Sequence, residues 1–319
     1  MELVSVIIVN WNKKAYLKDC LDSLLNQTHS PIEIIVVDNG SWDGSQQMLK
    51  EKFPQVRLII NEQNELYCRA YNQGIGAAEG EYMMCLNNDV VLEKDFVEEF
   101  LKAANANESI GMVCGKIMSW DRATIDSAGQ LLGRSRRPVE RGYKKKDSAR
   151  FDEPRYIFSA GGVAPLYKRK MLEEIKIDGE CFDESYGMFY EDLDVAWRAN
   201  LLGWRGFYNP QALACHRRGG TAKAYMPRIS FLKRYDFAYL SGELKVSLVK
   251  NRYMTILKND RLRDFIINLP WIIAYEVKLW AYSVFFEPCL IPEIIKGLSC
   301  LKTALRKRRQ IWRLQKAKK

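Results

Sequence analysis

The chain has 319 residues, of which 47% are hydrophobic and 12% aromatic, so it can bury a large core and wholesale disorder is excluded. Its net charge of +10 comes from the tail, because Lys296 to the C-terminus holds ten Lys or Arg and no Asp or Glu, which leaves a neutral body without a nucleic-acid groove. The eight cysteines are scattered without a CxxC pair and no secretory signal is visible, which predicts a cytoplasmic protein with reduced thiols.

The first part of the chain alternates between short apolar, β-branched runs and amphipathic stretches. The runs predict strands at Val4–Val9, Ile32–Val37, Arg57–Ile60 and Tyr82–Leu86, and the stretches predict helices at 17–25, Gln46–Phe53 and Tyr71–Ala78. Strands that are apolar throughout are typically buried on both faces of a parallel sheet. We therefore predict an α/β fold with a Rossmann-like, doubly wound and mostly parallel sheet.

Polar residues follow three of these strands, at Asn10–Asn12, Asp38–Gly44 and Asn87–Asp89. In open α/β sheets, ligands bind outside the carboxyl ends of the strands. The three segments therefore predict one ligand site along that edge.

The remainder divides into three parts. Residues 121–155 are polar and basic, and predict either a loop that covers the site or plain solvated surface. Tyr190–Leu202 predicts a helix. Beyond about residue 225 the composition changes to apolar, aromatic and basic helical stretches, so we predict a catalytic domain over 1–225 and a helical region over 226–319.

Two residues at the strand ends suit a nucleoside. A carboxylate at Asp38 can accept from a ribose hydroxyl or a pyrimidine N–H, although capping its own turn in DNGSWDGS is an equal alternative. Trp11 can pack on the base, although an aromatic residue at a strand end is more often part of the core.

The other candidates suit a leaving diphosphate and an attacking hydroxyl. Asp89 can hold a divalent ion against phosphate oxygens, although Asn-Asn-Asp also forms an acceptable turn. Glu191 and Asp192 can supply a general base, although acidic residues in a first helical turn commonly complement the helix dipole. His216 is a candidate metal ligand, with a structural role as the alternative. The chain has only two histidines, so a carboxylate is the better candidate for the base.

The ordered motifs resemble glycosyltransferase family 2, inverting enzymes with the GT-A fold. They are SVIIVNWN (5–12), VVDNGSWDGS (36–45), NEQNELYCRAYNQGI (61–75), LNNDV (86–90), FSAGGV (158–163), FDESYGMFYEDLDVAWRANLLGW (182–204) and ACHRRGGTA (214–222). The stretches IDSAGQLL (125–132) and VKNRYMTILKN (249–259) resemble the rhamnosyltransferase-like branch.

The resemblance implies a transfer of one sugar, with rhamnose as the expected donor sugar, from a dTDP- or UDP-sugar to a glycan or lipid-linked acceptor in cell-envelope polysaccharide synthesis. It implies Asp192 as the base with Glu191 beside it, Asp89 and His216 as ligands of Mg²⁺ or Mn²⁺, and a donor-nucleotide site formed by Val9, Trp11, Asn12, Asp38, Arg69 and Asn88. Asn-Asn-Asp replaces the family's Asp-x-Asp, which predicts weak or partial metal dependence. Leu66 and Arg69 stand where many members have small residues.

Other classes lack the sequences they require. A dinucleotide-binding oxidoreductase needs glycines after the first strand, and a P-loop enzyme needs GxxxxGK[ST]. A sugar-nucleotide nucleotidyltransferase would carry a Gly-rich basic loop after that strand. A non-catalytic protein of the membrane surface would explain the tail but not the polar strand ends.

The C-terminal region predicts a peripheral attachment to the inner face of the plasma membrane, on anionic lipid. Its longest uncharged run, Phe265–Tyr275, has eleven residues, too few for the ~20 of a spanning helix. Leu298, Leu301, Leu305 and Trp312 share one helical face amid basic residues, which suits a helix in the lipid interface. A helical cap on the catalytic domain, or a dimer contact, is the alternative.

Overall fold

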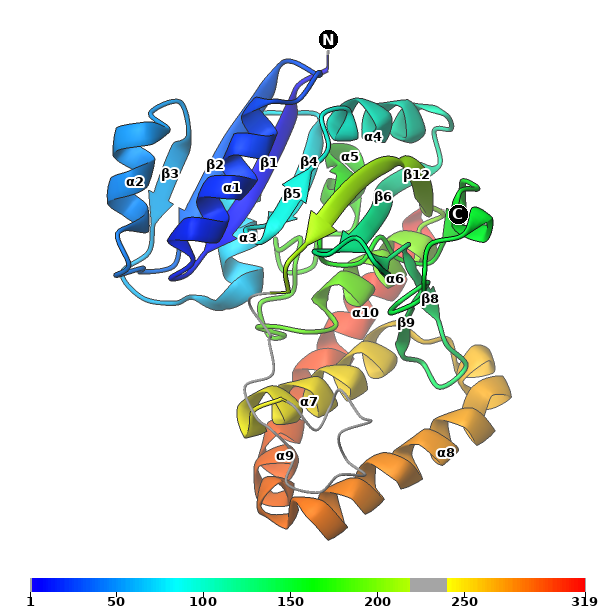
Figure 1. Cartoon of the computed structure of the whole chain (residues 1–319). Coiled ribbons are helices and arrows are strands. Elements are labelled where there is room, and N and C mark those ends of the chain that lie inside the picture. Colours follow the sequence, from blue (N-terminus) through cyan, green and yellow to red (C-terminus); the bar gives the residue numbers. More distant parts are fainter. Residues whose placement is uncertain (1, 219–239, 319) are drawn as a thin grey trace.

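The computed structural model describes residues 2–218 and 240–318. It contains a large twisted sheet with helices on both faces and a group of helices below one end of it (Figure 1). The strands of this sheet are β1 (Val4–Asn10), β2 (Ile32–Asp38), β3 (Arg57–Ile60), β4 (Tyr82–Asn87), β5 (Val90–Leu92), β6 (Ile110–Ser119), β7 (Ile125–Ser127), β10 (Arg155–Ile157), β11 (Leu166–Lys168) and β12 (Arg205–His216).

The N-terminal half of the sheet confirms the α/β prediction. Strands β4, β1, β2 and β3 lie side by side and run parallel, with Val4 opposite both Ile32 and Tyr82. The helices between them are α1 (Lys14–Leu25), α2 (Ser45–Lys52) and α3 (Leu66–Ala77). Side chains from β1 alternate between two buried clusters, one on each face of the sheet, as expected for a strand covered on both sides.

The other half of the sheet is mixed, which the sequence analysis did not predict. Strand β11 pairs antiparallel with both β4 and β6, whereas β12 pairs parallel with β6 over nearly its whole length. As a result β6 and β12 run in the same direction as β4, and all three end at one edge of the sheet. Helices α4 (Phe96–Asn105), α5 (Arg169–Glu174) and α6 (Glu191–Leu201) complete this half.

The segment 121–155 was predicted as a loop or solvated surface, and it is more ordered than that. It contains β7, the hairpin of β8 (Gln130–Leu132) and β9 (Pro138–Glu140), and the short helix η1 (Ala149–Phe151). Ile125, Ala128 and Phe151 from this segment belong to the core. These strands could not be predicted from the sequence, because each has only three residues, too few to show an alternating pattern.

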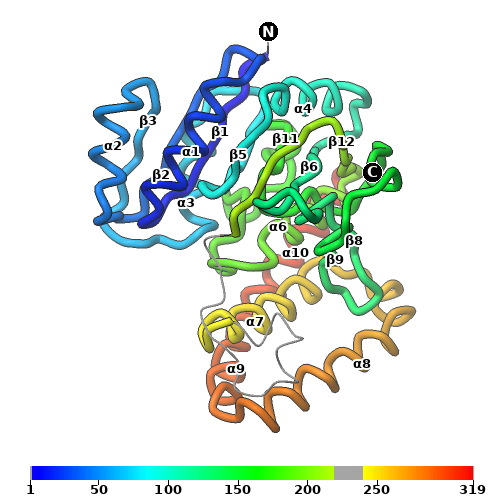
Figure 2. Tube along the Cα trace, in the orientation of Figure 1, coloured from blue at the N-terminus to red at the C-terminus, as the bar shows by residue number. Residues whose placement is uncertain are grey.

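The C-terminal region is helical, as predicted, and Figure 2 shows its path below the sheet. It comprises α7 (Gly242–Asn259), α8 (Leu262–Phe286), η4 (Pro288–Leu290), α9 (Ile291–Gly297), η5 (Leu298–Cys300) and α10 (Leu301–Ala317). The predicted domain boundary near residue 225, and the end of the ACHRRGGTA motif at 219–222, lie outside the described residues. Within the described ranges, every helix is too short or too polar to cross a bilayer.

Helix α10 differs from the lipid-facing helix that the sequence suggested. Its buried face is formed by Ala304, Lys307, Ile311 and Gln315, and it packs along α7. Its basic side chains also meet acidic partners in the α/β part of the chain, since Arg306 pairs with Asp178 at 2.6 Å. Helix α10 therefore has the geometry of the helical cap, which was the alternative.

Candidate functional site

The predicted strand-end residues come together along one edge of the sheet. Asn10 ends β1, Asp38 ends β2 and Asn87 ends β4, and the parallel pairing places these positions side by side. His216 ends β12 on the same edge, because β12 runs in the direction of β4. This edge is where an open α/β sheet binds its ligands.

Asn10 connects the first two strand ends to the third. Its buried amide donates to Asp38 at 3.0 Å and to Ser41 at 3.2 Å, and its carbonyl accepts from the amide of Asn88 at 2.9 Å. Sequence analysis placed Asn10 in the strand-end segment but gave it no role. A polar residue fully buried at a strand end is the signal that could have identified it as this hub.

Asp38 is fully buried in this arrangement. Besides Asn10, its carboxylate accepts from the backbone N–H of Ser41 at 2.9 Å and from the side chain of Gln46 at 2.8 Å. These are the contacts of a carboxylate that orders its own turn, which was the alternative role. Contact with the ribose or base stays a prediction.

The remaining donor-site candidates surround this turn, with one exception. Trp11 is exposed at the end of β1 and packs edge-on against the exposed Trp42, with ring centroids 6.0 Å apart. Asn12 accepts from the backbone N–H of Trp42 at 2.8 Å, and the half-buried Val9 packs on the core beneath. Arg69 is instead exposed on α3, where its guanidinium pairs with Glu65 at 2.9 Å.

Asp89 and His216 lie against each other, as the metal-site prediction requires. Nε2 of His216 is 3.1 Å from Asp89, and its Nδ1 is 2.8 Å from Asp126. Burial lowers the pKa of His216, but hydrogen bonds to the two carboxylates and their charges outweigh it and raise the pKa to about 9. His216 is therefore positively charged at neutral pH and bridges the two acids.

The donor set suits a divalent ion in part. An imidazole whose Nδ1–H donates to a carboxylate can present Nε2 to a metal, and Asp126 holds His216 in that orientation. Over the described ranges, no three His, Cys, Asp or Glu side chains converge to enclose an ion. Asp89 and His216 would therefore hold an ion only together with substrate phosphates and water, which is common for Mg²⁺ sites.

The hairpin of β8 and β9 brings a second acid and an amide to Asp192. The buried amide of Gln130 donates to Asp192 at 2.9 Å and to Glu140 at 2.6 Å, and Ser127 also donates to Glu140 at 2.6 Å. Burial raises the pKa of Glu140 to about 7, although the hydrogen bonds from Ser127 and Gln130 lower it. Sequence analysis named none of these three residues as site residues, because their segment carried no periodic signal.

Glu191 and Asp192 open α6 and lie in different environments. Burial raises the pKa of Asp192, while the N–H of Leu193 and the amide of Gln130 stabilise its ionised form. Glu191 is buried, and its Oε2 has no hydrogen-bond partner within the described parts of the chain. Burial and then the charge of Asp192 raise the pKa of Glu191 to about 8. At neutral pH the raised pKa keeps Glu191 protonated, so it adds no second negative charge beside Asp192.

The backbone around Asp192 leaves space on one side. A Cβ at Gly162 would stand 3.6 Å from the Asp192 carboxylate and 3.8 Å from the hydroxyl of Tyr67. That hydroxyl donates to the carbonyl of Gly162 at 3.0 Å. Because Gly162 has no side chain, this residue places no side-chain atom against Asp192.

These contacts form one polar network with two ends. It runs by hydrogen bonds from Asp38 through Asn10 to Asn88, and along the chain to Asp89. It then runs through His216 to Asp126, and along the chain to Ser127. From Ser127 it continues through Glu140 and Gln130 to Asp192. The site thus joins the polar strand ends, an acid–histidine group and the carboxyl group of Asp192.

Comparison with known proteins gives concordant matches. The sequence model of glycosyl transferase family 2 matches residues 5–176. Glycosyltransferase GlyG of Streptococcus pneumoniae serotype 4 is 26% identical over 273 residues, which are 81% of this chain and 87% of that protein. The N-acetylglucosaminyl-diphospho-decaprenol L-rhamnosyltransferase of Mycobacterium tuberculosis is 26% identical over 241 residues, which are 68% and 76% of the two chains.

A solved structure shares the fold. The mannosyltransferase PcManGT from Pyrobaculum calidifontis, determined in complex with GDP-Man and Mn²⁺, superposes with a TM-score of 0.53. The match covers 99% of this chain and 86% of that chain at 14% identity. At that identity the likeness concerns the architecture, and it extends beyond the part that the family model matches.

Proposed function

This chain belongs to glycosyl transferase family 2 and is a glycosyltransferase, and we propose that it transfers one sugar from a nucleoside-diphosphate donor to an acceptor hydroxyl with inversion. The observation that carries the proposal is the polar network from the strand ends to Asp192. This network supports a base at Asp192 and a group at Asp89 and His216 that neutralises the leaving diphosphate. Family membership also sets aside the nucleotidyltransferase and the non-catalytic alternatives.

Asp192 is the proposed general base. Its carboxylate takes the proton of the acceptor hydroxyl while that oxygen forms a bond to the anomeric carbon of the donor. The bond from the anomeric carbon to the diphosphate oxygen breaks on the opposite face, and the nucleoside diphosphate leaves. A single displacement of this kind inverts the anomeric configuration.

The neighbouring residues have two proposed roles, one at the base and one at the leaving diphosphate. Gln130 and the N–H of Leu193 donate to Asp192, which orients it and favours its ionised form, and the neutral Glu191 avoids a second negative charge beside it. Asp89 and His216 would hold a divalent ion, Mg²⁺ or Mn²⁺. Such an ion would neutralise the charge that develops on the leaving diphosphate.

The donor sugar and acceptor are proposed from the relatives. Rhamnose, carried by dTDP or UDP, is the proposed donor sugar, because the mycobacterial relative is named as an L-rhamnosyltransferase. That relative's name also describes an acceptor on diphospho-decaprenol, so a lipid-linked glycan of the cell envelope is the proposed acceptor class.

A donor screen tests the proposal. Purified protein is incubated with dTDP-, UDP- and GDP-sugars and a lipid-linked or synthetic glycan acceptor, and released nucleoside diphosphate is measured together with the anomeric configuration of the product. We expect acceptor-dependent release from one donor class and an inverted linkage. A retained configuration, or pyrophosphate release from a nucleoside triphosphate and a sugar phosphate, would overturn it.

A membrane contact is proposed from one further observation, the outer face of α8. Its large apolar side chains are exposed, including Leu262 at 70%, Val277 at 62% and Phe285 at 78%. Guanidinium groups lie among its aromatic rings, with Arg134 4.5 Å from the ring centroid of Trp271. Apolar, aromatic and basic groups together suit the interface of an anionic bilayer, where a lipid-linked acceptor would also be held.

Liposome flotation tests this contact. The wild type should float with anionic vesicles, less with neutral ones, and less at high salt. An Ile266→Glu, Val277→Glu variant should lose flotation but keep activity on a soluble acceptor analogue. Equal flotation of variant and wild type would exclude α8 as the contact.

A further inference from the structure

The segment that leads into α6 has an unusual backbone. Gly187, Phe189 and Tyr190 have φ angles of 70°, 72° and 70°. Glycine adopts this left-handed region freely, but two consecutive aromatic residues rarely do. Tyr190 directly precedes Glu191 and Asp192, so the direction in which Asp192 leaves the turn depends on this conformation. Such a turn persists only where surrounding groups hold it.

One side chain of the C-terminal helices holds this turn. The amide of Asn251, fully buried on α7, donates to the backbone carbonyls of Tyr186 at 2.9 Å, Met188 at 2.7 Å and Phe189 at 2.8 Å. A carbonyl oxygen can only accept, so three of them around one nitrogen require an N–H₂ group, whose two hydrogens are shared among the three acceptors. A carboxylate or a hydrophobic side chain cannot replace it, because neither donates a hydrogen bond.

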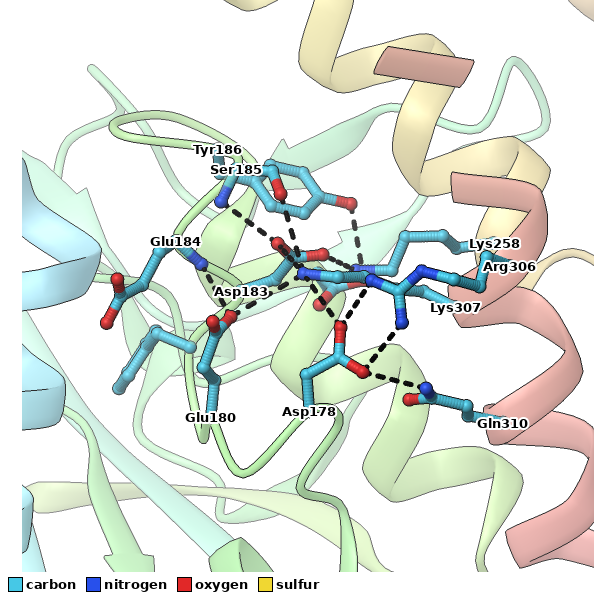
Figure 3. Close-up of polar contacts among 12 residues, drawn as sticks. Asp178, Glu180, Asp183, Glu184, Ser185, Tyr186, Lys258, Arg306, Lys307 and Gln310 are labelled. Carbon is cyan, nitrogen blue, oxygen red and sulfur yellow. Dashed lines mark hydrogen bonds and ion pairs between the residues drawn. The ribbon is translucent and has the colours of Figure 1, made fainter. Parts of the chain in front are cut away.

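Ion pairs from α7 and α10 hold the start of the segment that leads into α6. Lys258 of α7 and Lys307 of α10 reach the two oxygens of Asp183 at 2.5 Å and 2.7 Å (Figure 3). Lys258 also lies 3.0 Å from Asp194 on α6. Burial raises the pKa of Asp183, but the charges of both lysines outweigh it and lower the pKa. The segment is therefore held at both ends, and Asn251 acts on the turn between them.

We propose that Asn251 is a positioning residue that sets the direction of Asp192 toward the acceptor by holding the backbone of residues 186–190. This inference rests on the proposed role of Asp192 as the base. It makes α7 a part of the catalytic apparatus and not only a cap on the domain. Lys258 of the same helix holds the flanking residues Asp183 and Asp194, whereas Asn251 holds the turn itself.

The test compares Asn251→Ala with a matched variant, Lys245→Met, on the same helix. Lys245 is equally buried and pairs with Glu287 at 2.5 Å, away from the 186–190 turn. Both changes should lower the thermal midpoint. Only Asn251→Ala should lower kcat, by about 10- to 100-fold, because small displacements of a catalytic group have losses of this size. Calorimetric affinity for the nucleoside diphosphate should be unchanged in both.

A double-mutant cycle with Asp192→Asn distinguishes an effect that acts through Asp192 from a general loss of activity. If Asn251 acts through Asp192, Asn251→Ala should reduce the residual rate of the Asp192→Asn protein by no more than about twofold. Losses that multiply in full would mean that Asn251 acts elsewhere. If Asn251→Ala does not fold, Asn251→Ser, which keeps one donor, should show the same pattern at smaller amplitude.

The outcomes distinguish this inference from the proposed function. An active Asp192→Asn protein would remove the base and the inference with it. An inactive Asp192→Asn protein beside an Asn251→Ala protein with wild-type kcat would overturn the inference alone. Parallel losses of kcat in Asn251→Ala and Lys245→Met would also overturn it, since both would then reflect stability.

Discussion

Replacing Glu191 by glutamine should make the protein more stable at neutral and alkaline pH. Glu191 is 7% exposed, and burial with the neighbouring charge of Asp192 raises its pKa from the ordinary 4.5 to about 8. Between these values, the folded protein keeps a proton at Glu191 that the unfolded chain has lost. The free energy of unfolding therefore falls as pH rises through this window. Glutamine resembles the protonated form and does not titrate.

The size of the effect follows from the same window. Each unit of pKa difference corresponds to about 1.4 kcal/mol, so the full window sets an upper limit of about 5 kcal/mol at pH 8. Relaxation and water entry around a buried carboxyl reduce such values, and we expect about 2–3 kcal/mol. Near pH 5 most of the difference should vanish, because Glu191 is then protonated in the folded protein and the pH is only about half a unit above the pKa of 4.5 in the unfolded chain.

Chemical unfolding of Glu191→Gln and wild type between pH 5 and pH 8.5, followed by circular dichroism, measures the difference directly. The control is Glu184→Gln, which makes the same change at an exposed position and alters no buried carboxyl. Gln130→Glu is not used as a control because it adds a charge at the site. Two stability curves that stay parallel across this pH range would refute the reasoning, because Glu191 would then titrate normally in the folded protein.

Three further predictions concern other parts of the site. Asp89→Asn should weaken nucleoside-diphosphate binding in calorimetry only when Mn²⁺ is present, and equal weakening without metal would exclude the ligand role. Gln130→Leu removes a hydrogen bond to the ionised Asp192. The acid limb of kcat/KM should therefore move about one pH unit higher, and an unmoved limb would contradict this. Trp11→Ala should cost about 1–3 kcal/mol of nucleoside binding if the ring stacks on the base, and unchanged affinity would exclude stacking.

The parallel half of the fold could be predicted from sequence because its strands are apolar along their whole length. Val4–Val9 and Ile32–Val37 signal burial on both faces without reference to their neighbours. The mixed half could not be predicted in this way. The pairing of β11 between β4 and β6 joins three-residue and ten-residue strands far apart in the chain, and local pattern carries no information on such pairing.

The site shows the same division. Asp89, His216 and Asp192 were named in advance from their residue types and the family resemblance, and the structure brings Asp89 and His216 into contact. Gln130 and Glu140 were missed, since their roles depend on a short hairpin that folds across the site. The basic tail was assigned to lipid, but its charges on α10 meet acids that lie more than a hundred residues earlier.

The central claim is that Asp192 deprotonates the acceptor, and Asp192→Asn tests it most directly. Single-turnover transfer should slow by ~10²–10⁴ while calorimetric affinity for the nucleoside diphosphate stays within error of wild type, because the base acts on the acceptor. If the variant keeps more than about half of the wild-type rate, well outside that loss, Asp192 is not the base.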